Sequence, residues 1–200
     1  MEEQNILFSK HLQHALSEAL GKAPYDRLFI LTDETTNQFC LPAIIGHPKL
    51  KDAVVITIGS GDEHKNTESL THVWKSLSEG GATRRSLLIN LGGGMVTALG
   101  GFAASTFKRG MAFLNIPTTL LSMVDASVGG KTGINFNGLK NEIGVFRNAF
   151  EVIIDTEFLR TLDVQNICSG FAEMLKHALI SREDEWAQLL QFNLQDPDLP

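Results

Sequence analysis

Five basic residues lie in or beside loops rich in glycine and polar residues. They are Lys108, Arg109, Lys131, Lys140 and Lys176, in a chain whose formal net charge is -6. Arginine can bind phosphate through two parallel hydrogen bonds and lysine acts as a point charge, so the group indicates an anionic ligand. Solvated surface charge is the alternative for each lysine taken singly. The segments Gly129-Gly130-Lys131-Thr132 and Gly138-Leu139-Lys140-Asn141 favour the ligand, because glycine lets the backbone approach it as well.

A glycine triplet, Gly92-Gly93-Gly94, separates an apolar run from a helical pattern. Backbone N–H groups at such a turn can approach a phosphate, and the helix N-terminus adds partial positive charge. The triplet is neither the Rossmann fingerprint, which would need glycine in place of Thr97, nor a P-loop. A tight left-handed turn is the alternative. Gly100 and Gly101 would weaken the following helix unless a ligand or another helix packs closely against it.

Two acidic positions are further candidates for chemistry. Asp125 could pair with a lysine, act on a substrate hydroxyl or cap a helix. Glu173 and His177 are four residues apart in a helical pattern, so they share a helix face and could both bind a metal ion. One pair is incomplete as a metal site, and a surface Glu–His pair is the simpler interpretation.

Buried strands must position these residues. Apolar runs rich in β-branched residues occur at Arg27–Thr32, Ala53–Ile58, Ser86–Leu91, Met111–Ile116 and Glu151–Ile154. Each lacks polar alternation, which predicts a strand buried on both faces. Between them, apolar stripes with helical spacing run from Leu12 to Leu20 and from Leu70 to Leu77. The alternation predicts an α/β fold, a Rossmann-like parallel sheet with helices on both faces.

Ligands of such folds bind outside the carboxyl ends of the strands. Small, hydroxyl or charged residues follow four of the predicted strands, at Thr32-Asp33, Gly59 to Lys65, Gly92 to Gly94 and Pro117 to Thr119. Glycine, aspartate and threonine are also common in turns and caps, but a purely structural loop set would not need them at every strand end. Asn137-Gly138 predicts a tight hairpin turn.

Composition excludes several other classes. An acidic chain lacks the basic face needed for nonspecific binding to nucleic acid or to a membrane surface. Cys40 and Cys168 form no paired motif, which fits a reducing compartment. The N-terminus is acidic where a signal peptide would be basic, and no apolar run is long enough to span a bilayer. The expected location is the cytoplasm.

Taken together, the motifs resemble the 3-dehydroquinate synthases. The resemblance covers Asp33 to His177 and rests on five motifs in matching order and spacing: Gly92 to Gly110, Pro117 to Leu121, Val124 to Thr132, Gly138 to Asn141 and Ala172 to Lys176. Related sugar-phosphate cyclases share much of this pattern. A glycerol-dehydrogenase-like enzyme would share the fold and glycine turn but not the two glycine–lysine motifs.

The resemblance implies a lyase of the shikimate pathway, which leads to the aromatic amino acids. Such enzymes use NAD and a divalent metal, zinc or cobalt, to convert 3-deoxy-D-arabino-heptulosonate 7-phosphate into 3-dehydroquinate and phosphate. The cofactor carries the hydride chemistry and the protein supplies orientation and electrostatics. A homodimer is expected, with no nucleic-acid or membrane partner.

Site residues carried over from the resemblance fall into three groups. The cofactor-binding group is Asp33, Asp62, Lys65, Gly93, Gly94, Met95, Thr118, Thr119, Lys140, Phe158 and Thr161. The catalytic and substrate-binding group is Arg109, Asp125, Lys131, Asn141 and Lys176. Glu173 matches a metal ligand, whereas His177 is not at a ligand position of the family.

Two features depart from the family pattern. Ala98 stands where the family keeps an aspartate that contacts the cofactor, which predicts weakened NAD binding on an intact fold and leaves a degenerate, non-catalytic binding protein as an alternative. The resemblance also divides the chain into an NAD-binding α/β domain, residues 1–164, and the beginning of an all-α domain, residues 165–200. That domain supplies two histidine metal ligands in the family, expected beyond Pro200, so these 200 residues alone are expected not to turn over substrate.

Overall fold

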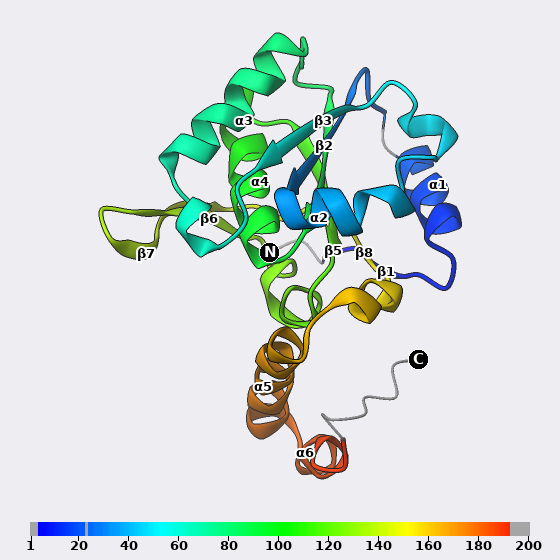
Figure 1. The fold of residues 1–200 in the computed structure, drawn as a ribbon, viewed down its shortest axis with the longest axis vertical. Coiled ribbons are helices and arrows are strands. Elements are labelled where there is room, and N and C mark those ends of the chain that lie inside the picture. The colour runs from blue at the N-terminus through cyan, green and yellow to red at the C-terminus, as the bar shows by residue number, and fades with distance from the viewer. Residues whose placement is uncertain (1–3, 23, 193–200) are drawn as a thin grey trace.

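A six-stranded parallel sheet forms the centre of the computed structural model, which describes residues 4–22 and 24–192 (Figure 1). The strand order is β1-β8-β5-β4-β2-β3. The strands are β1 (Ile6–Phe8), β2 (Leu28–Asp33), β3 (Val54–Ile58), β4 (Leu87–Gly92), β5 (Ala112–Pro117) and β8 (Glu151–Ile154). The predicted Rossmann-like α/β class is confirmed, and all five predicted strands are present to within a residue.

Helices cover both faces of the sheet. In Figure 1, α3 and α4 lie on one side, and α1 and α2 on the other. The helices are α1 (Leu12–Lys22), α2 (Glu34–Phe39), α3 (Thr67–Glu79) and α4 (Gly94–Thr106). Short 3-10 turns are η1 (Leu41–Ala43), η2 (Pro48–Leu50), η3 (Asp62–His64), η4 (Phe107–Arg109) and η6 (Thr156–Thr161). The apolar stripes expected for α1 and α3 are the buried faces of these helices.

The edges of the sheet differ from the sequence prediction. The run at 53–58 was predicted to be buried on both faces, but β3 is an edge strand, and Val54 and Val55 are exposed. The short strand β1 on the opposite edge was not predicted, because three residues carry too little periodicity to be recognised. The central strand β4 is buried along its whole length, as its apolar run predicts.

Helix α4 is enclosed rather than amphipathic, with every residue from Val96 to Ala104 buried. A Cβ atom on Gly100 would lie 2.0 Å from Oδ1 of Asn90 in β4, and one on Gly101 would lie 2.6 Å from Cγ2 of Thr132. The close neighbours of these glycines are therefore the sheet and the β6 strand, not the ligand or second helix that was predicted.

The strand β6 belongs to a hairpin that projects beside α4 and away from the sheet (Figure 1). It pairs antiparallel with β7, the two strands being Lys131–Phe136 and Leu139–Phe146. Asn137 and Gly138 at its tip have φ values of 51° and 78°, the left-handed pair that a tight two-residue turn requires. The predicted hairpin turn is confirmed.

Two helices, α5 (Val164–Ser181) and α6 (Glu183–Leu189), extend below the sheet (Figure 1). Asp163 caps α5 by accepting a hydrogen bond from the Asn166 N–H at 2.8 Å. The division of the chain into residues 1–164 and 165–200 stays a prediction, and residues 193–200 lie outside the described part. Among the described helices, none combines the length and apolar character needed to cross a membrane.

Candidate functional site

A cleft of about 810 Å³ lies at the carboxyl edge of the sheet. Residues from the ends of β2 and β4, the loop after β3, the segment after β5 and the β6–β7 hairpin line it. The predicted site residues among its lining are Asp33, Asp62, Lys65, Gly93, Gly94, Met95, Thr119, Asp125, Lys131, Lys140 and Asn141. The fold thus brings together side chains that are more than 100 positions apart in the chain, at the edge where α/β proteins bind ligands.

The glycine turn lies between β4 and α4. Gly93 has φ of -72°, and none of the three glycines is among the residues with positive φ. The left-handed alternative is therefore wrong. A Cβ on Gly94 would lie 3.0 Å from Cβ of Ala126, so close approach of another segment explains the glycine here. The N-terminus of α4 opens into the cleft with no side-chain cap, which leaves N–H groups for an anion.

Asp33 ends β2 and caps α2. Its Oδ1 accepts hydrogen bonds from the Thr36 N–H at 2.7 Å and from the Thr36 hydroxyl at 3.0 Å. These bonds hold the carboxylate in one orientation at the cleft edge. A fixed acceptor of this kind suits a ligand hydroxyl group.

Polar contacts join the hairpin to the loop after β3. Lys65 Nζ donates to Asn141 Oδ1 at 2.6 Å, and Lys140 Nζ lies 3.0 Å from Asp62 Oδ2. Asn135 of the hairpin also binds the loop after β3, since its N–H donates to the Lys65 carbonyl at 2.7 Å. Within the hairpin, its Oδ1 accepts a hydrogen bond from the Asn141 N–H at 2.9 Å. Asn141 has φ of 56°, a left-handed conformation that asparagine tolerates.

Burial and charge shift two pKa values in this network. Burial lowers the pKa of Lys65, although the neighbouring Asp62 opposes that shift. The Lys140 ammonium lowers the pKa of Asp62 through their hydrogen bond. The cleft thus presents two lysine side chains that already contact acceptors of the protein, and an anionic ligand would compete for them.

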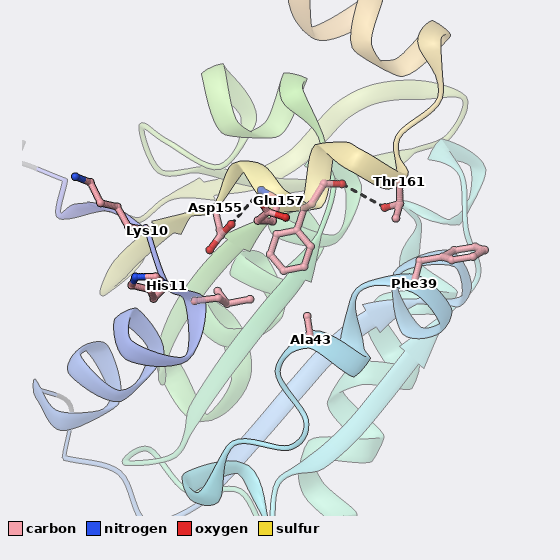
Figure 2. A pocket seen from close by; sticks show the side chains of 9 residues that line it. Lys10, His11, Phe39, Ala43, Asp155, Glu157 and Thr161 are labelled. Atoms are coloured by element: carbon pink, nitrogen blue, oxygen red, sulfur yellow. Dashed lines mark hydrogen bonds between the residues drawn. The ribbon is translucent and has the colours of Figure 1, made fainter. Parts of the chain in front are cut away.

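Three predicted cofactor residues do not line this cleft. Thr118 is buried and is not among the residues that line the cleft. Phe158 and Thr161 lie on η6 and line a second cavity of about 490 Å³ (Figure 2). Lys10, His11, Phe39 and the buried Asp155 also line that cavity, and Figure 2 shows them around its opening. The proposed contact of Phe158 and Thr161 with the cofactor stays a prediction.

Two predicted substrate residues also lie outside the cleft lining. Arg109 is exposed on η4, past the far end of α4. That helix has 13 residues, so Arg109 lies roughly 20 Å along its axis from the glycine turn, at about 1.5 Å per residue. Lys176 is on α5, where its ammonium group contacts Glu173 Oε1, which raises the pKa of Lys176.

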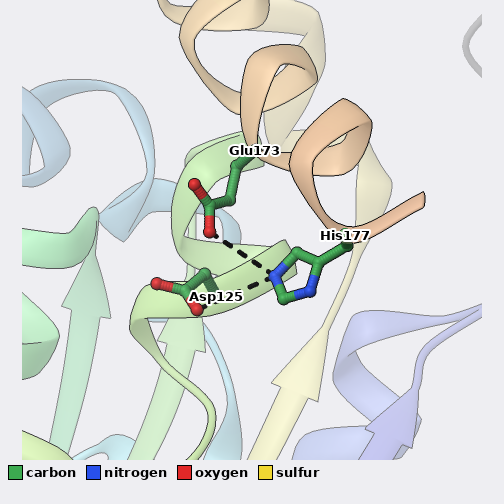
Figure 3. A group of neighbouring side chains, drawn as sticks. All are labelled: Asp125, Glu173 and His177. Atoms are coloured by element: carbon green, nitrogen blue, oxygen red, sulfur yellow. Dashed lines mark ion pairs between the residues drawn. The ribbon is translucent and has the colours of Figure 1, made fainter. Parts of the chain in front are cut away.

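Glu173 is joined by His177, as their helical spacing predicts, and by Asp125, which the sequence did not connect with it. His177 Nε2 lies 3.5 Å from Glu173 Oε1 and 3.8 Å from Asp125 Oδ1 (Figure 3). Asp125 belongs to η5 (Ser122–Ala126), a π-helical turn that packs against α5. Helical spacing predicts the Glu173–His177 pair, but it could not predict Asp125, which lies 48 residues before Glu173 in the chain.

The donor set fits a divalent metal ion. Two carboxylates and one imidazole are ligands that zinc accepts, and their donor atoms lie within 4.8 Å of one another. His177 Nε2 is a buried atom without a hydrogen-bond partner in the described part of the chain. An orphaned nitrogen between two carboxylates is the arrangement that a bound cation would satisfy.

Sequence reasoning missed further residues of the cleft wall. They are Gly61, Leu121, Ala126, Thr132, Gly133, Glu142, Gly144, Val145, Phe146 and Asn166. Several belong to the hairpin, whose inward-facing positions follow from its pairing register and its packing on α4. Ala98 also lines the cleft, on the first half of α4, so a carboxylate at this position would face the ligand space.

The carboxyl-edge cleft of the parallel sheet and the adjoining Asp–Glu–His cluster define a ligand-binding α/β protein, and its structural neighbours include sugar-phosphate cyclases. A crystal structure of 2-deoxy-scyllo-inosose synthase, complexed with carbaglucose-6-phosphate, NAD+ and Co2+, matches 90% of this chain and 50% of its own. The TM-score is 0.83 and the identity 25%. Glycerol dehydrogenase from Schizosaccharomyces pombe, at 18% identity and TM-score 0.68, covering 88% of this chain and 43% of its own, shares the fold alone.

The chain belongs to the 3-dehydroquinate synthase family, because the family's N-terminal model matches residues 55–169. A 3-dehydroquinate synthase of Parabacteroides distasonis is 50% identical over 97% of this chain and 55% of its own length. That of Pyrococcus furiosus is 42% identical over 80% of this chain and 48% of its own. The chain therefore spans about half the length of these relatives.

Proposed function

We propose that the chain forms the NAD-binding part of a 3-dehydroquinate synthase. The activity is the conversion of 3-deoxy-D-arabino-heptulosonate 7-phosphate into 3-dehydroquinate with release of phosphate, in the shikimate pathway. One observation carries the proposal: a single cleft brings the glycine turn, Asp33 and the lysines of both glycine–lysine motifs to one edge of the sheet. Family membership supports NAD as the cofactor and a phosphorylated sugar acid as the substrate class of this cleft.

In this proposal, the first part of the cleft binds NAD. Asp33 accepts hydrogen bonds from the ribose hydroxyls, and the N–H groups at Gly93 and Gly94 donate to the pyrophosphate. Lys65 and Lys140 give up their contacts with Asn141 and Asp62 to reach the cofactor. When bound, NAD supplies a transient oxidation of a substrate alcohol, which acidifies the neighbouring C–H bond.

The second part of the cleft binds the phosphorylated substrate. Lys131 and Asn141 approach it from the hairpin, and Asp125 is placed to accept a hydrogen bond from a substrate hydroxyl. Lys176 lies beside Glu173 and extends this group with a further cation. Glu173 holds the divalent metal, zinc or cobalt, which supplies Lewis-acid polarisation of substrate oxygens when bound.

Arg109 supports a homodimer. Its sequence context matches a substrate contact, yet it lies about a helix length from the cleft of its own chain. A second copy could present Arg109 to that cleft, which would reconcile the two observations. The family and the acidic composition also favour a cytoplasmic protein with no nucleic-acid or membrane partner.

Two assays test the proposal. Calorimetric titration of the chain with NAD should show saturable binding, and absence of binding would contradict the cofactor assignment. Phosphate release by the full-length gene product should occur with the heptulosonate phosphate. Release only from a different sugar phosphate would instead identify a related cyclase. Alcohol oxidation without phosphate release would indicate a glycerol-dehydrogenase-like enzyme, and neither reaction would indicate a binding protein.

A further inference from the structure

Two asparagines lie side by side in the middle of the sheet, in a row whose flanking positions are apolar. Asn90 in β4 and Asn115 in β5 are register partners, with Leu31 and Val152 on the neighbouring strands. Asn90 is fully buried and Asn115 is 4% exposed. An apolar pair of similar size would fill this space without the cost of removing two amides from water. Packing of the core alone therefore does not explain the pair.

The two amides form a chain of hydrogen bonds that leads out of the sheet. Asn90 Nδ2 donates to Asn115 Oδ1 at 2.9 Å, and Asn115 Nδ2 donates to the Ser127 carbonyl at 3.1 Å. Both hydrogen bonds are buried. Helix α4 leaves space for the first amide at Gly100, where a Cβ atom would lie 2.0 Å from Asn90 Oδ1. Because the oxygen of Asn115 accepts from Asn90, its NH2 group is turned toward Ser127.

Ser127 is the inner anchor of the segment between η5 and β6. It alone is buried among residues 124–131, all of which are described. Its hydroxyl group has no hydrogen-bond partner in the described part of the chain. The N–H groups of Ser127 and Val128 bond within the segment itself, to the carbonyls of Ser122 and Asp125. The bond from Asn115 is therefore the one that ties the Ser127 backbone to the sheet.

Two residues of the carboxyl-edge cleft flank this anchor. Asp125 precedes Ser127 and Lys131 follows it, and both line the cleft. Gly129 and Gly130 between them have φ values of 86° and 70°, and no atom lies within 4 Å of the Cβ position of Gly129. Glycine restricts the backbone little, so local stiffness of the chain does not fix the two side chains. The bond to Ser127 limits how far they can move.

We propose that Asn115 is a positioning residue of the carboxyl-edge cleft. Through the Ser127 carbonyl it holds the segment that carries Asp125 and Lys131 in place, and Asn90 keeps the Asn115 amide turned toward that carbonyl. In the interior of a protein these bonds are stronger than in water, and breaking one leaves a buried polar group unpaired. The contact of Asp125 and Lys131 with substrate rests on the proposed function; the anchoring of the segment does not.

Hydrogen exchange of the chain itself tests the anchoring. In Asn115→Leu, the amides of Ser127 and Val128 should exchange roughly tenfold faster, the effect of one lost hydrogen bond. Asn115→Ala removes the same donor without adding bulk and should give the same result, which keeps the test open if circular dichroism shows that Asn115→Leu is unfolded. Asn90→Leu keeps the bond to Ser127 and should have a smaller effect.

The control is Ser86→Ala, which removes a hydrogen bond of 2.7 Å to Asp26 just before β4. It should leave the exchange of Ser127 and Val128 unchanged. Equal exchange in Asn115→Leu and Ser86→Ala would overturn the proposal, as would faster exchange in Asn90→Leu than in Asn115→Leu.

Steady-state kinetics of the full-length gene product test the consequence for the substrate. Asn115→Leu should raise KM for the heptulosonate phosphate by about tenfold, because Asp125 and Lys131 lose their fixed positions. A general loss of stability would instead lower the amount of active protein, and so the apparent kcat, and leave KM unchanged. A fall in kcat alone would therefore overturn the positioning role. Hydrogen exchange needs no turnover, so failure of the proposed function is distinguishable from failure of the anchoring.

Discussion

The sheet and the helical extension formed by α5 and α6 differ in how they bury apolar surface. Leu88, Ile89 and Phe113 in the central strands are at most 1% exposed. On the extension, Val164, Leu179, Ile180 and Leu190 are 64–74% exposed, and α6 has no buried residue. The carboxyl-edge cleft is therefore built on a closed core, whereas Glu173 and His177 lie on a helix with exposed apolar faces.

One close contact joins the two regions. A Cβ on Gly170 of α5 would lie 2.5 Å from Cβ of Leu120 and 2.6 Å from the Leu121 backbone nitrogen. This approach lets α5 pack closely against the segment that leads into η5, the turn that carries Asp125. The carboxyl-edge cleft thus depends on the folding of the sheet, and the Asp125–Glu173–His177 cluster depends on the docking of one helix.

The largest expected effect is on the core of the sheet. Phe113→Ala should lower the free energy of unfolding by about 3–5 kcal/mol, because it leaves a cavity among fully buried side chains. Leu190→Ala on the extension should change it by less than about 0.5 kcal/mol. Urea denaturation measures both. Similar losses for the two variants would break the distinction between a closed core and an open extension.

The next effect concerns the carboxyl-edge cleft, the proposed NAD site. Asp33→Ala should weaken NAD binding by roughly 10–100-fold, since hydrogen bonds to a charged group contribute about 1.5–3 kcal/mol. Asp26→Ala is the matched control at the opposite end of the same strand, where the carboxylate accepts a hydrogen bond from Ser86 at 2.7 Å. It should leave NAD affinity unchanged in calorimetry. Co2+ binding should be the same in both variants.

Gly170→Val should have the opposite effect to Asp33→Ala and weaken Co2+ binding rather than NAD binding. The added side chain would push α5 away from Leu120 at a cost of about 1–3 kcal/mol, and it should separate Glu173 from Asp125. Co2+ affinity should then fall while NAD affinity stays the same. Gly46→Val is the control, because no atom lies within 4 Å of its Cβ position. An equal loss of affinity for Co2+ and for NAD in Gly170→Val would show that the sheet and the helical extension behave as one unit.

Ala98→Asp tests the departure from the family pattern. The new carboxylate would face the cleft and should tighten NAD binding by about tenfold, the equivalent of one hydrogen bond of roughly 1.4 kcal/mol. Ala104→Asp is unsuitable as a control because Ala104 is fully buried, so Ser105→Asp on the same helix serves instead. Equal NAD affinities for Ala98→Asp and the unsubstituted chain would refute the prediction that Ala98 weakens NAD binding.

The smallest effect is a pH dependence. Burial lowers the pKa of Lys65, so as pH rises its charge is lost earlier than that of an ordinary lysine. NAD affinity should therefore decline at alkaline pH. Lys65→Arg stays charged and should flatten this decline, whereas the exposed Lys75→Arg should not. A decline that persists unchanged in Lys65→Arg would exclude Lys65 as its cause.

Local sequence patterns by themselves determine much of the fold of this protein. Apolar runs predicted the strands because buried parallel strands tolerate few polar residues, and Asn137-Gly138 predicted the hairpin because few residues adopt its left-handed angles. The motif resemblance named the family, and most of the residues it marked lie around one cleft.

Only the tertiary structure decided which distant groups meet. The order β1-β8-β5-β4-β2-β3 follows from packing among whole elements, which no local propensity encodes. For that reason the sequence could not show that Phe158 faces a second cavity, that Arg109 lies beyond the far end of α4, or that Asp125 lies beside His177. Spacing within one helix identified the Glu173–His177 pair, but the third donor required the docking of α5 on η5.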